Sequence, residues 1–187
     1  MSKFVQYIIM LFCILKVSSC ATLYKVSDII SQIDKYMDTH PIKNYYVTID
    51  PNNLLDDIDH KLLEKYQNII FEKYGLVTMV IVAKAFESYG HGLQPFITQF
   101  FNQFKKVFDL QRLNCIISVI SINEHRIALD VSNRMRHIFT DNVLNALHDN
   151  MKITFNQNHL FLTIYNLLKN IEKGQKQYEE KGIITEL

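Results

Sequence analysis

The sequence predicts an α/β fold, a three-layer α/β/α sandwich around a small mixed β-sheet. Two nearly unbroken apolar and β-branched runs, 76–83 and 113–122, are typical of strands buried on both faces. A helical pattern at 95–108 separates them, so the two strands should be parallel neighbours joined by a helical crossover. A turn at 123–125 then leads into a third strand, 126–131, which should pair antiparallel with the second.

The first 20 residues have the order of a secretory signal peptide. Lys3 supplies a positive start, apolar residues fill 7–15, and small residues surround a cleavage site after Cys20 or Ala21. This predicts a secreted or extracytoplasmic protein. Residues 17–20 also fit a bacterial lipoprotein box that would anchor Cys20 to lipid, although Lys16 beside it argues against that. An uncleaved anchor is the remaining alternative, but the apolar run is short for a bilayer.

Composition bounds the class of protein. The chain has 187 residues, 48% of them hydrophobic and 21% charged, which are globular values. A net charge of +1 gives no broad field that would gather nucleic acid. Cys115 is the only cysteine certain to remain in the mature chain, so no internal disulfide is expected. Its apolar strand favours a small buried hydrophobe over a reactive thiol.

Two helices and a short β-rich segment precede the first buried strand. Residues 24–40 form an amphipathic helix, and 45–49 are a strand or an extended lead. The next helix starts at Asp56 or Asp57, and Gly75 stands where a left-handed C-cap belongs. Its apolar stripe is expected at Ile58, Leu62, Tyr66, Ile69 and Ile70. Whether residues 22–45 pack on the domain or act as a tether stays open.

Three helices are predicted in the rest of the chain. The helix that starts near Pro95 has an aromatic face, which at this spacing is core packing more often than a cofactor or lipid box: Ile97, Phe100, Phe101, Phe104 and Phe108. A second helix starts near Thr140 and turns Val143, Leu144, Leu147 and Met151 inward, and a last one carries Leu160, Ile164, Leu167, Leu168 and Ile171. Beyond Gly174 the chain is polar and is expected to fray.

The order of these elements matches a known pattern, and so do particular residues. Three places of this pattern are occupied here. A Val-Asn-Asp-like start matches Asp50, a helix start matches Leu55 and Asp56, and the glycine that ends the helix matches Gly75. Residues 113–141 align without a gap to a strand, a charged turn, Arg-x-x-Ile-Glu-Val, a Gly-x-Gly-Leu-Glu loop and Leu-Thr-Asp. The agreeing residues are Arg126, Leu129, Asp130, Val131, Met135, Phe139, Thr140 and Asp141. In this combination the chain resembles the TPM domain, a family named for a thylakoid lumen protein, a photosystem II repair protein and the modulator of levamisole receptors.

The signal pattern, the helix periodicity and the resemblance together divide the chain into four parts. They are a signal peptide at 1–20, an N-terminal amphipathic helix and linker at 21–45, a TPM-like α/β domain at 46–172 and a polar C-terminal tail at 173–187.

The chain departs from the family pattern in the loop after the third strand. The loop glycines are replaced by Ser132 and Arg134, the glutamate by Arg136 and the next glycine by His137. Glycine permits close backbone approach to a ligand, and carboxylates bind hard cations. Activity that depends on these positions in relatives is therefore not expected here.

The resemblance implies a non-enzymatic interaction or accessory module. It would bind a protein partner, such as the extracellular part of a membrane receptor or a membrane complex, through loops at one edge of the sheet. The alternative is a phosphatase-like hydrolase or a calcium-binding domain that uses the remaining carboxylates.

Seven residues are candidates for binding, each with a plainer interpretation. The acidic ones are Asp50, Glu87, Asp130 and Asp141, and the basic cluster is Arg134, Arg136 and His137. Asp141 is more simply an N-cap, Asp50 a turn residue before Pro51, and Asp130 a side chain that faces water. The basic cluster would suit an anion or an acidic partner surface, yet a solvated loop explains it too. The histidines show no metal signature, and no phosphate loop or nucleophile elbow is present.

Overall fold

The computed structural model describes residues 23–39, 47–86, 93–108, 114–157, 159–182 and 184. The predicted signal peptide, Cys20 and Glu87 lie outside these residues.

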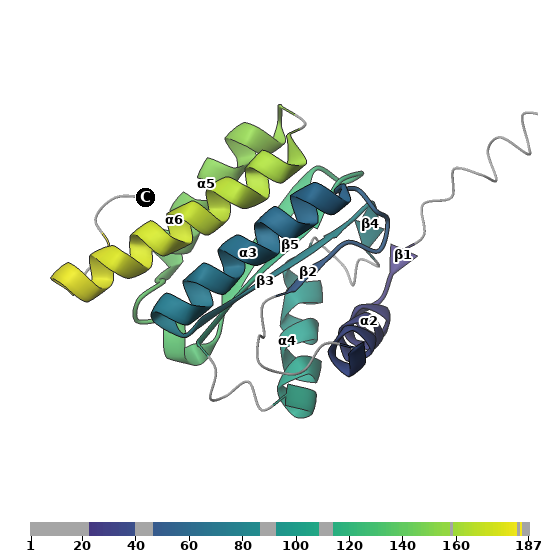
Figure 1. Ribbon diagram of the computed structural model, residues 1–187, viewed down its shortest axis with the longest axis horizontal. Helices are drawn as coiled ribbons and strands as arrows, with labels where there is room; N and C mark the ends of the chain where they lie inside the picture. The colour runs from purple at the N-terminus through teal and green to yellow at the C-terminus, as the bar shows by residue number, and fades with distance from the viewer. Residues whose placement is uncertain are drawn as a thin grey trace, which may run out of the picture.

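A four-stranded mixed sheet forms the middle layer (Figure 1). Its order is β2 (Val47–Ile49), β3 (Leu76–Ala83), β5 (Asn114–Ser121) and β6 (Arg126–Val131). β2, β3 and β5 run parallel, and β6 pairs antiparallel with β5. The predicted parallel pair and hairpin are confirmed, and the β-rich segment at 45–49 contributes a strand. β2 and β6 are the two edges of the sheet.

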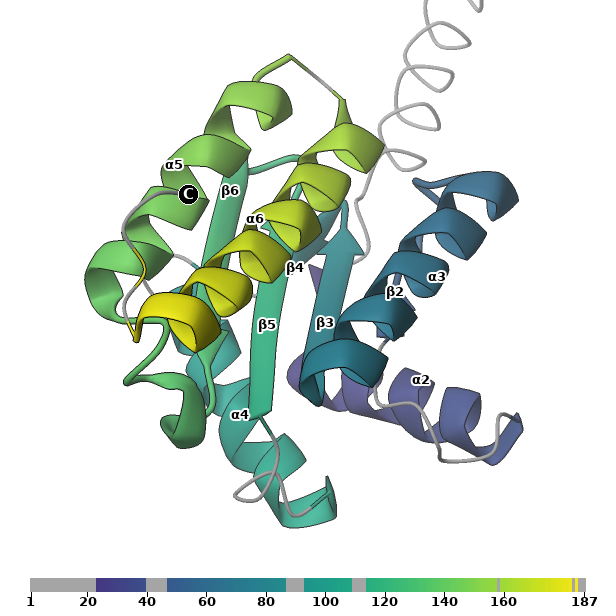
Figure 2. The ribbon, with the colours of Figure 1, turned by 60° about the vertical axis from the view of Figure 1, so that its left-hand side comes forward.

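Helices cover both faces of this sheet. α3 (Asp57–Tyr74), α5 (Asp141–Phe155) and α6 (Leu160–Lys181) pack on one face, and α2 (Val26–Thr39) and α4 (Gln94–Phe108) on the other (Figures 1 and 2). Alternate residues of β3 and β5 point into one core or the other, so both strands are buried throughout, apart from the half-buried Asn114. The three-layer α/β/α architecture is confirmed.

The N-terminal helix belongs to the folded unit. Val26, Ile29 and Ile33 are buried in the core between α2, α4 and the sheet. Just before it, β1 (Leu23–Tyr24) pairs in parallel with β4 (Ala85–Phe86), which follows β3 closely. The sequence left open whether residues 22–45 pack on the domain, and the described part of this segment, residues 23–39, does pack.

The ends of α3 follow the prediction, but its buried stripe does so only in part, since Ile70 is buried and Tyr66 packs against the core. The side chain of Asp56 accepts the N–H groups of Ile58 and Asp59 at 2.9 and 2.8 Å, and Gly75 takes the left-handed cap. Three members of the predicted stripe are exposed instead: Ile58 at 69%, Leu62 at 48% and Ile69 at 40%.

The buried stripe of α3 is Leu63, Gln67 and Ile70. A polar residue occupies its middle because its amide is fully satisfied there. The Gln67 Nε2 donates to the carbonyl of Thr78 at 2.9 Å, and its Oε1 accepts the Thr48 hydroxyl at 3.0 Å. The helix is thus rotated from the face that apolar residues alone indicate.

The aromatic face of α4 is core, as far as it is described. Ile97 and Phe100 are buried between α4 and the sheet. The side chains of Phe101, Phe104 and Phe108 lie outside the described residues.

The end of α6 corrects another prediction. The helix does not fray after Gly174 but continues to Lys181, and Gly174 and Gln175 are buried. Tyr178 packs against the core one turn further on, so residues 173–181 are part of the domain and not a tail. None of the described helices is long and apolar enough to cross a membrane.

Candidate functional site

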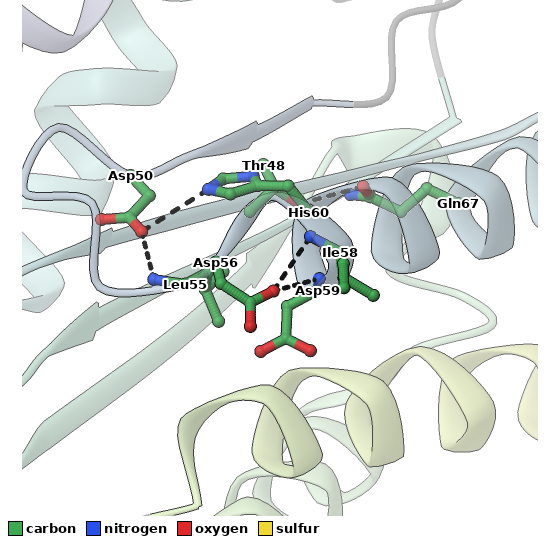
Figure 3. Close-up of polar contacts among 8 residues, drawn as sticks. All are labelled: Thr48, Asp50, Leu55, Asp56, Ile58, Asp59, His60 and Gln67. Carbon is green, nitrogen blue, oxygen red and sulfur yellow. Dashed lines mark hydrogen bonds and ion pairs between the residues drawn. The ribbon is translucent and has the colours of Figure 1, made fainter.

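Asp50 lies just after β2 and faces α3 (Figure 3). Its side chain is 0% exposed. Its Oδ2 accepts the Leu55 N–H at 2.7 Å and lies 3.5 Å from the Nε2 of His60. Its backbone carbonyl accepts the Asn53 N–H, which agrees with the turn interpretation. Asp50 therefore ties the loop before α3 to the sheet edge and does not face solvent.

Asp130 and Asp141 lie at the opposite edge of the sheet, on either side of Arg136. The Nη2 of Arg136 donates to the Oδ1 of Asp130 at 2.8 Å, and its Nη1 lies 3.8 Å from the Oδ1 of Asp141. Asp130 also accepts the N–H of Val131. Asp141 is the first residue of α5, after Thr140 at the N-cap, so the prediction that Asp141 itself is the cap is off by one residue.

The rest of the predicted basic cluster belongs to the same loop. Arg134 lies in the 3₁₀ turn η2 (Asn133–Met135) and is exposed. The ring of His137 meets the edge of the Tyr178 ring of α6, with centroids 5.6 Å apart. Arg136 is paired with two carboxylates, and His137 packs on an aromatic ring. These two side chains are therefore engaged within the protein, which does not favour anion binding by this loop.

The predicted carboxylates do not converge. Asp50 follows one edge strand and Asp130 lies on the other, so three strand spacings, roughly 14 Å across the sheet, separate the two strands. Asp50 faces α3, whereas Asp130 lies opposite Ile117, whose side chain points to α2 and α4. No group of three or more acidic, histidine or cysteine side chains within the described ranges is placed to hold a metal. Arg136 stands between Asp130 and Asp141, so these two do not fit a calcium ion either.

A groove of about 430 Å³ runs along β6, and sequence reasoning did not find it. Its floor is formed by residues 125–129, at the outer edge of the sheet. One wall is the start of α4, and the other is a face of α5. The wall residues are Leu93, Gln94, Leu144, Asn145, His148 and Lys152. Figure 2 shows β6 at the sheet edge with α5 beside it.

The backbone of β6 is open toward this groove. In an antiparallel pair, alternate residues direct their N–H and C=O toward the partner strand, and the others direct them away. Ile127 and Leu129 are the outward residues, because the carbonyl of Ile127 accepts a hydrogen bond from the Nε2 of His148 on α5 at 3.2 Å. By the same alternation Leu129 directs its N–H and C=O out of the sheet, and neither group has a backbone partner outside the sheet among the described residues.

The ionisable groups that line the groove are all basic: His125, Arg126, His148 and Lys152. Asp149 lies next to the lining, 3.7 Å from the Nδ1 of His148 and 3.7 Å from the Nζ of Lys152, and its carboxylate is largely exposed. The groove is therefore a channel with basic lining residues beside a strand edge that has no strand partner.

One signal in the sequence indicates this groove. Leu144, Asn145, His148 and Lys152 recur at helical spacing, so a polar row follows the apolar one on α5. The predicted hairpin also gives β6 one partner, and in the sheet its other side is open. Neither observation shows by itself that α4 and α5 flank that side without closing it.

Cys115 has no part in the site. It is fully buried, and burial raises the pKa of its thiol to about 12, as expected for an unreactive core cysteine.

No sequence family model matches the chain, and no curated protein does. Solved structures do match. The N-terminal domain of a protein from P. gingivalis gives a TM-score of 0.67 at 12% identity and covers 89% of this chain and 99% of that one. The N-terminal domain of the cg2496 protein from Corynebacterium glutamicum gives 0.54 at 12% identity, over 73% and 84%. The BA42 protein from the psychrophilic bacterium Bizionia argentinensis gives 0.57 at 13% identity, over 73% and 93%. At such low identity the likeness concerns the fold, which this chain shares with these bacterial α/β domains.

Proposed function

We propose that the protein is a non-enzymatic interaction module of the TPM-domain type that binds a protein partner in the groove along β6. The observation that carries the proposal is the outer edge of β6, which has no strand partner and lies open between α4 and α5, with only the carbonyl of Ile127 taken by His148. A strand edge with unused hydrogen-bonding groups is a ready-made binding surface for another chain.

The TPM assignment is supported by two independent likenesses. The residues of 46–172 resemble the family pattern, and the fold is shared with three bacterial domains of similar size. The groove is formed by the hairpin strand on which the resemblance is densest, so the proposed surface is close to the loops at the sheet edge that the sequence indicated.

The hydrolase alternative receives no support from the geometry. A hydrolase that used Asp50 and Asp130 together would need them in one cleft. Asp50 is buried beside α3, and Asp130 is paired with Arg136 at the other edge.

The proposed setting is outside the cytoplasm. The order of charges and apolar residues in the first 20 positions supports export, and the partner is then a secreted protein or the extracellular part of a membrane receptor or complex.

Capture from the producing cells with a matched control tests the proposal. The bait is the immobilised protein, as wild type, as the groove variant Arg126→Glu/Lys152→Glu and as the control Lys61→Glu/Lys173→Glu. All four side chains are exposed, and the two variants change the net charge equally. We expect a protein that wild type and control retain and the groove variant loses. A partner that all three retain equally contradicts the proposed surface.

A second assay addresses the non-enzymatic part of the proposal. We expect no turnover of p-nitrophenyl phosphate above background, with or without added calcium. Turnover that Asp130→Asn abolishes would establish a hydrolase instead.

A further inference from the structure

We infer that the groove receives an extended acidic peptide segment of the partner, which joins the sheet beside β6 and inserts one large apolar side chain next to His125. This inference rests on the proposed function and specifies the chemistry of the ligand.

The extended conformation follows from the backbone. Ile127 and Leu129 direct their N–H and C=O groups out of the sheet, and a strand laid beside β6 would pair with them. His148 currently occupies the carbonyl of Ile127 from α5. A helical segment would offer β6 no free backbone groups, because its own N–H and C=O groups bond within the helix.

The acidic character follows from charge complementarity. His125, Arg126, His148 and Lys152 surround the strand edge, and no carboxylate lines the groove. Arg126 and Lys152 are exposed at the rim, where opposite charges on a ligand favour the encounter and select the partner. Asp149, next to the lining, lies near His148 and Lys152 and offsets part of their charge.

The apolar side chain follows from a second cavity at the end of the groove. Its volume is about 160 Å³, and Leu54, Ile122, Phe155 and Leu160 line it. His125 lines both cavities, and its ring lies 5.9 Å from that of Phe155. A chain that follows β6 toward residue 125 therefore reaches an apolar pocket at the point where the basic groove ends, and a leucine or phenylalanine side chain suits such a pocket.

Binding of labelled synthetic peptides tests the inference. The probe is a fluorescein-labelled short peptide in which valine alternates with glutamate and a leucine ends the sequence, made with the leucine at either end. Three matched peptides replace the glutamates by lysine, methylate every second backbone nitrogen, or replace the leucine by serine. Fluorescence anisotropy with the full-length protein measures each affinity at low and at physiological salt.

We expect one of the two acidic peptides to bind saturably and each control to bind about tenfold more weakly or not at all. Added salt should weaken the acidic peptide. Arg126→Glu/Lys152→Glu should invert the preference, so that the lysine peptide binds better than the glutamate peptide. Hydrogen exchange should show slower exchange of the Ile127 and Leu129 amides on binding, which a purely electrostatic contact would not cause.

Other results would overturn the inference. Equal affinity for the glutamate and lysine peptides removes the acidic requirement, and equal affinity for the N-methylated peptide removes strand addition. Absence of saturable binding by every peptide removes both. If the groove variant still loses its cellular partner in that case, the proposed function stands and only the ligand's chemistry is wrong. Concentration-dependent dimerisation that the groove variant abolishes would make a second copy of this chain the occupant.

Discussion

Two polar side chains, Asp50 and Gln67, are buried beside the edge strand β2 and organise it. Asp50 holds the N–H of Leu55, and Gln67 joins Thr48 on β2 to the carbonyl of Thr78 on β3. Buried polar groups are tolerated when their hydrogen bonds are made, as those of Gln67 are, whereas the Oδ1 of Asp50 is buried without a partner among the described residues. At this scale, a residue that the sequence offered as a binding candidate, Asp50, and one that it did not single out, Gln67, act as structural links (Figure 3).

Replacing Asp50 tests this structural role. We expect Asp50→Ala to lower the free energy of unfolding by about 2 kcal/mol, because it removes a charged acceptor and leaves the Leu55 N–H without its partner. Asp50→Asn keeps an acceptor oxygen and should lower it less. Urea denaturation measures both, and an Asp50→Ala variant as stable as wild type would contradict the role.

Glu172 on α6 makes the stability of the fold depend on pH. The Tyr66 hydroxyl donates to its Oε2 at 2.5 Å, and the Nζ of Lys73 lies 3.2 Å from its Oε1. The hydrogen bond from Tyr66 lowers the pKa of Glu172 below its ordinary value of 4.5, and the hydrogen bond from Lys73 lowers it further by a smaller amount. A carboxyl group with a lowered folded-state pKa stabilises the fold above its unfolded-state pKa, and this contribution is lost as the pH falls through the folded-state pKa.

The prediction concerns the difference in stability between wild type and Glu172→Gln. Wild type should be the more stable at neutral pH, and its advantage should shrink as the pH falls below about 4.5. Thermal unfolding across this pH range measures it. Glu180→Gln, at an exposed residue of the same helix, is the matched control and should follow wild type throughout. A constant difference at all pH values would exclude the assignment.

At the scale of elements, α3 shows how far local rules reach. Its N-cap at Asp56, its C-cap at Gly75 and its length follow from residue types in the chain. Its orientation about its own axis does not, because the row that is buried has a polar residue at its middle. The choice is made by Gln67, whose amide needs Thr48 and Thr78 on the sheet.

Adjacent leucines on α3 provide the test of its orientation. Leu63→Ala should cost about 2–5 kcal/mol of stability, since Leu63 is fully buried. Leu62→Ala, the same change one residue earlier, should cost about 0.5 kcal/mol or less, because that side chain is largely exposed. Equal losses in chemical denaturation would place Leu62 in the core and return α3 to the orientation that its sequence indicates.

At the scale of the whole molecule, the fold could be predicted from the sequence, but the groove could not. Buried strands such as 76–83 and the turn at 123–125 identify the layers, because hydrophobic runs and turn residues act locally. The groove depends on where α4 and α5 come to lie beside β6, and that is decided by packing between segments distant in the chain. For the same reason Asp50 and Asp130, both candidates from the sequence, are on opposite edges.

The open outer edge of β6 is the central claim, and amide hydrogen exchange of the free protein measures it residue by residue. Ala128 and Asp130 face β5, so their amides should exchange slowly, whereas the Leu129 amide between them should exchange fast. This alternation along one strand is the predicted result. A Leu129 amide protected as strongly as that of Ala128 would mean that the edge is already covered, and it would contradict the binding groove.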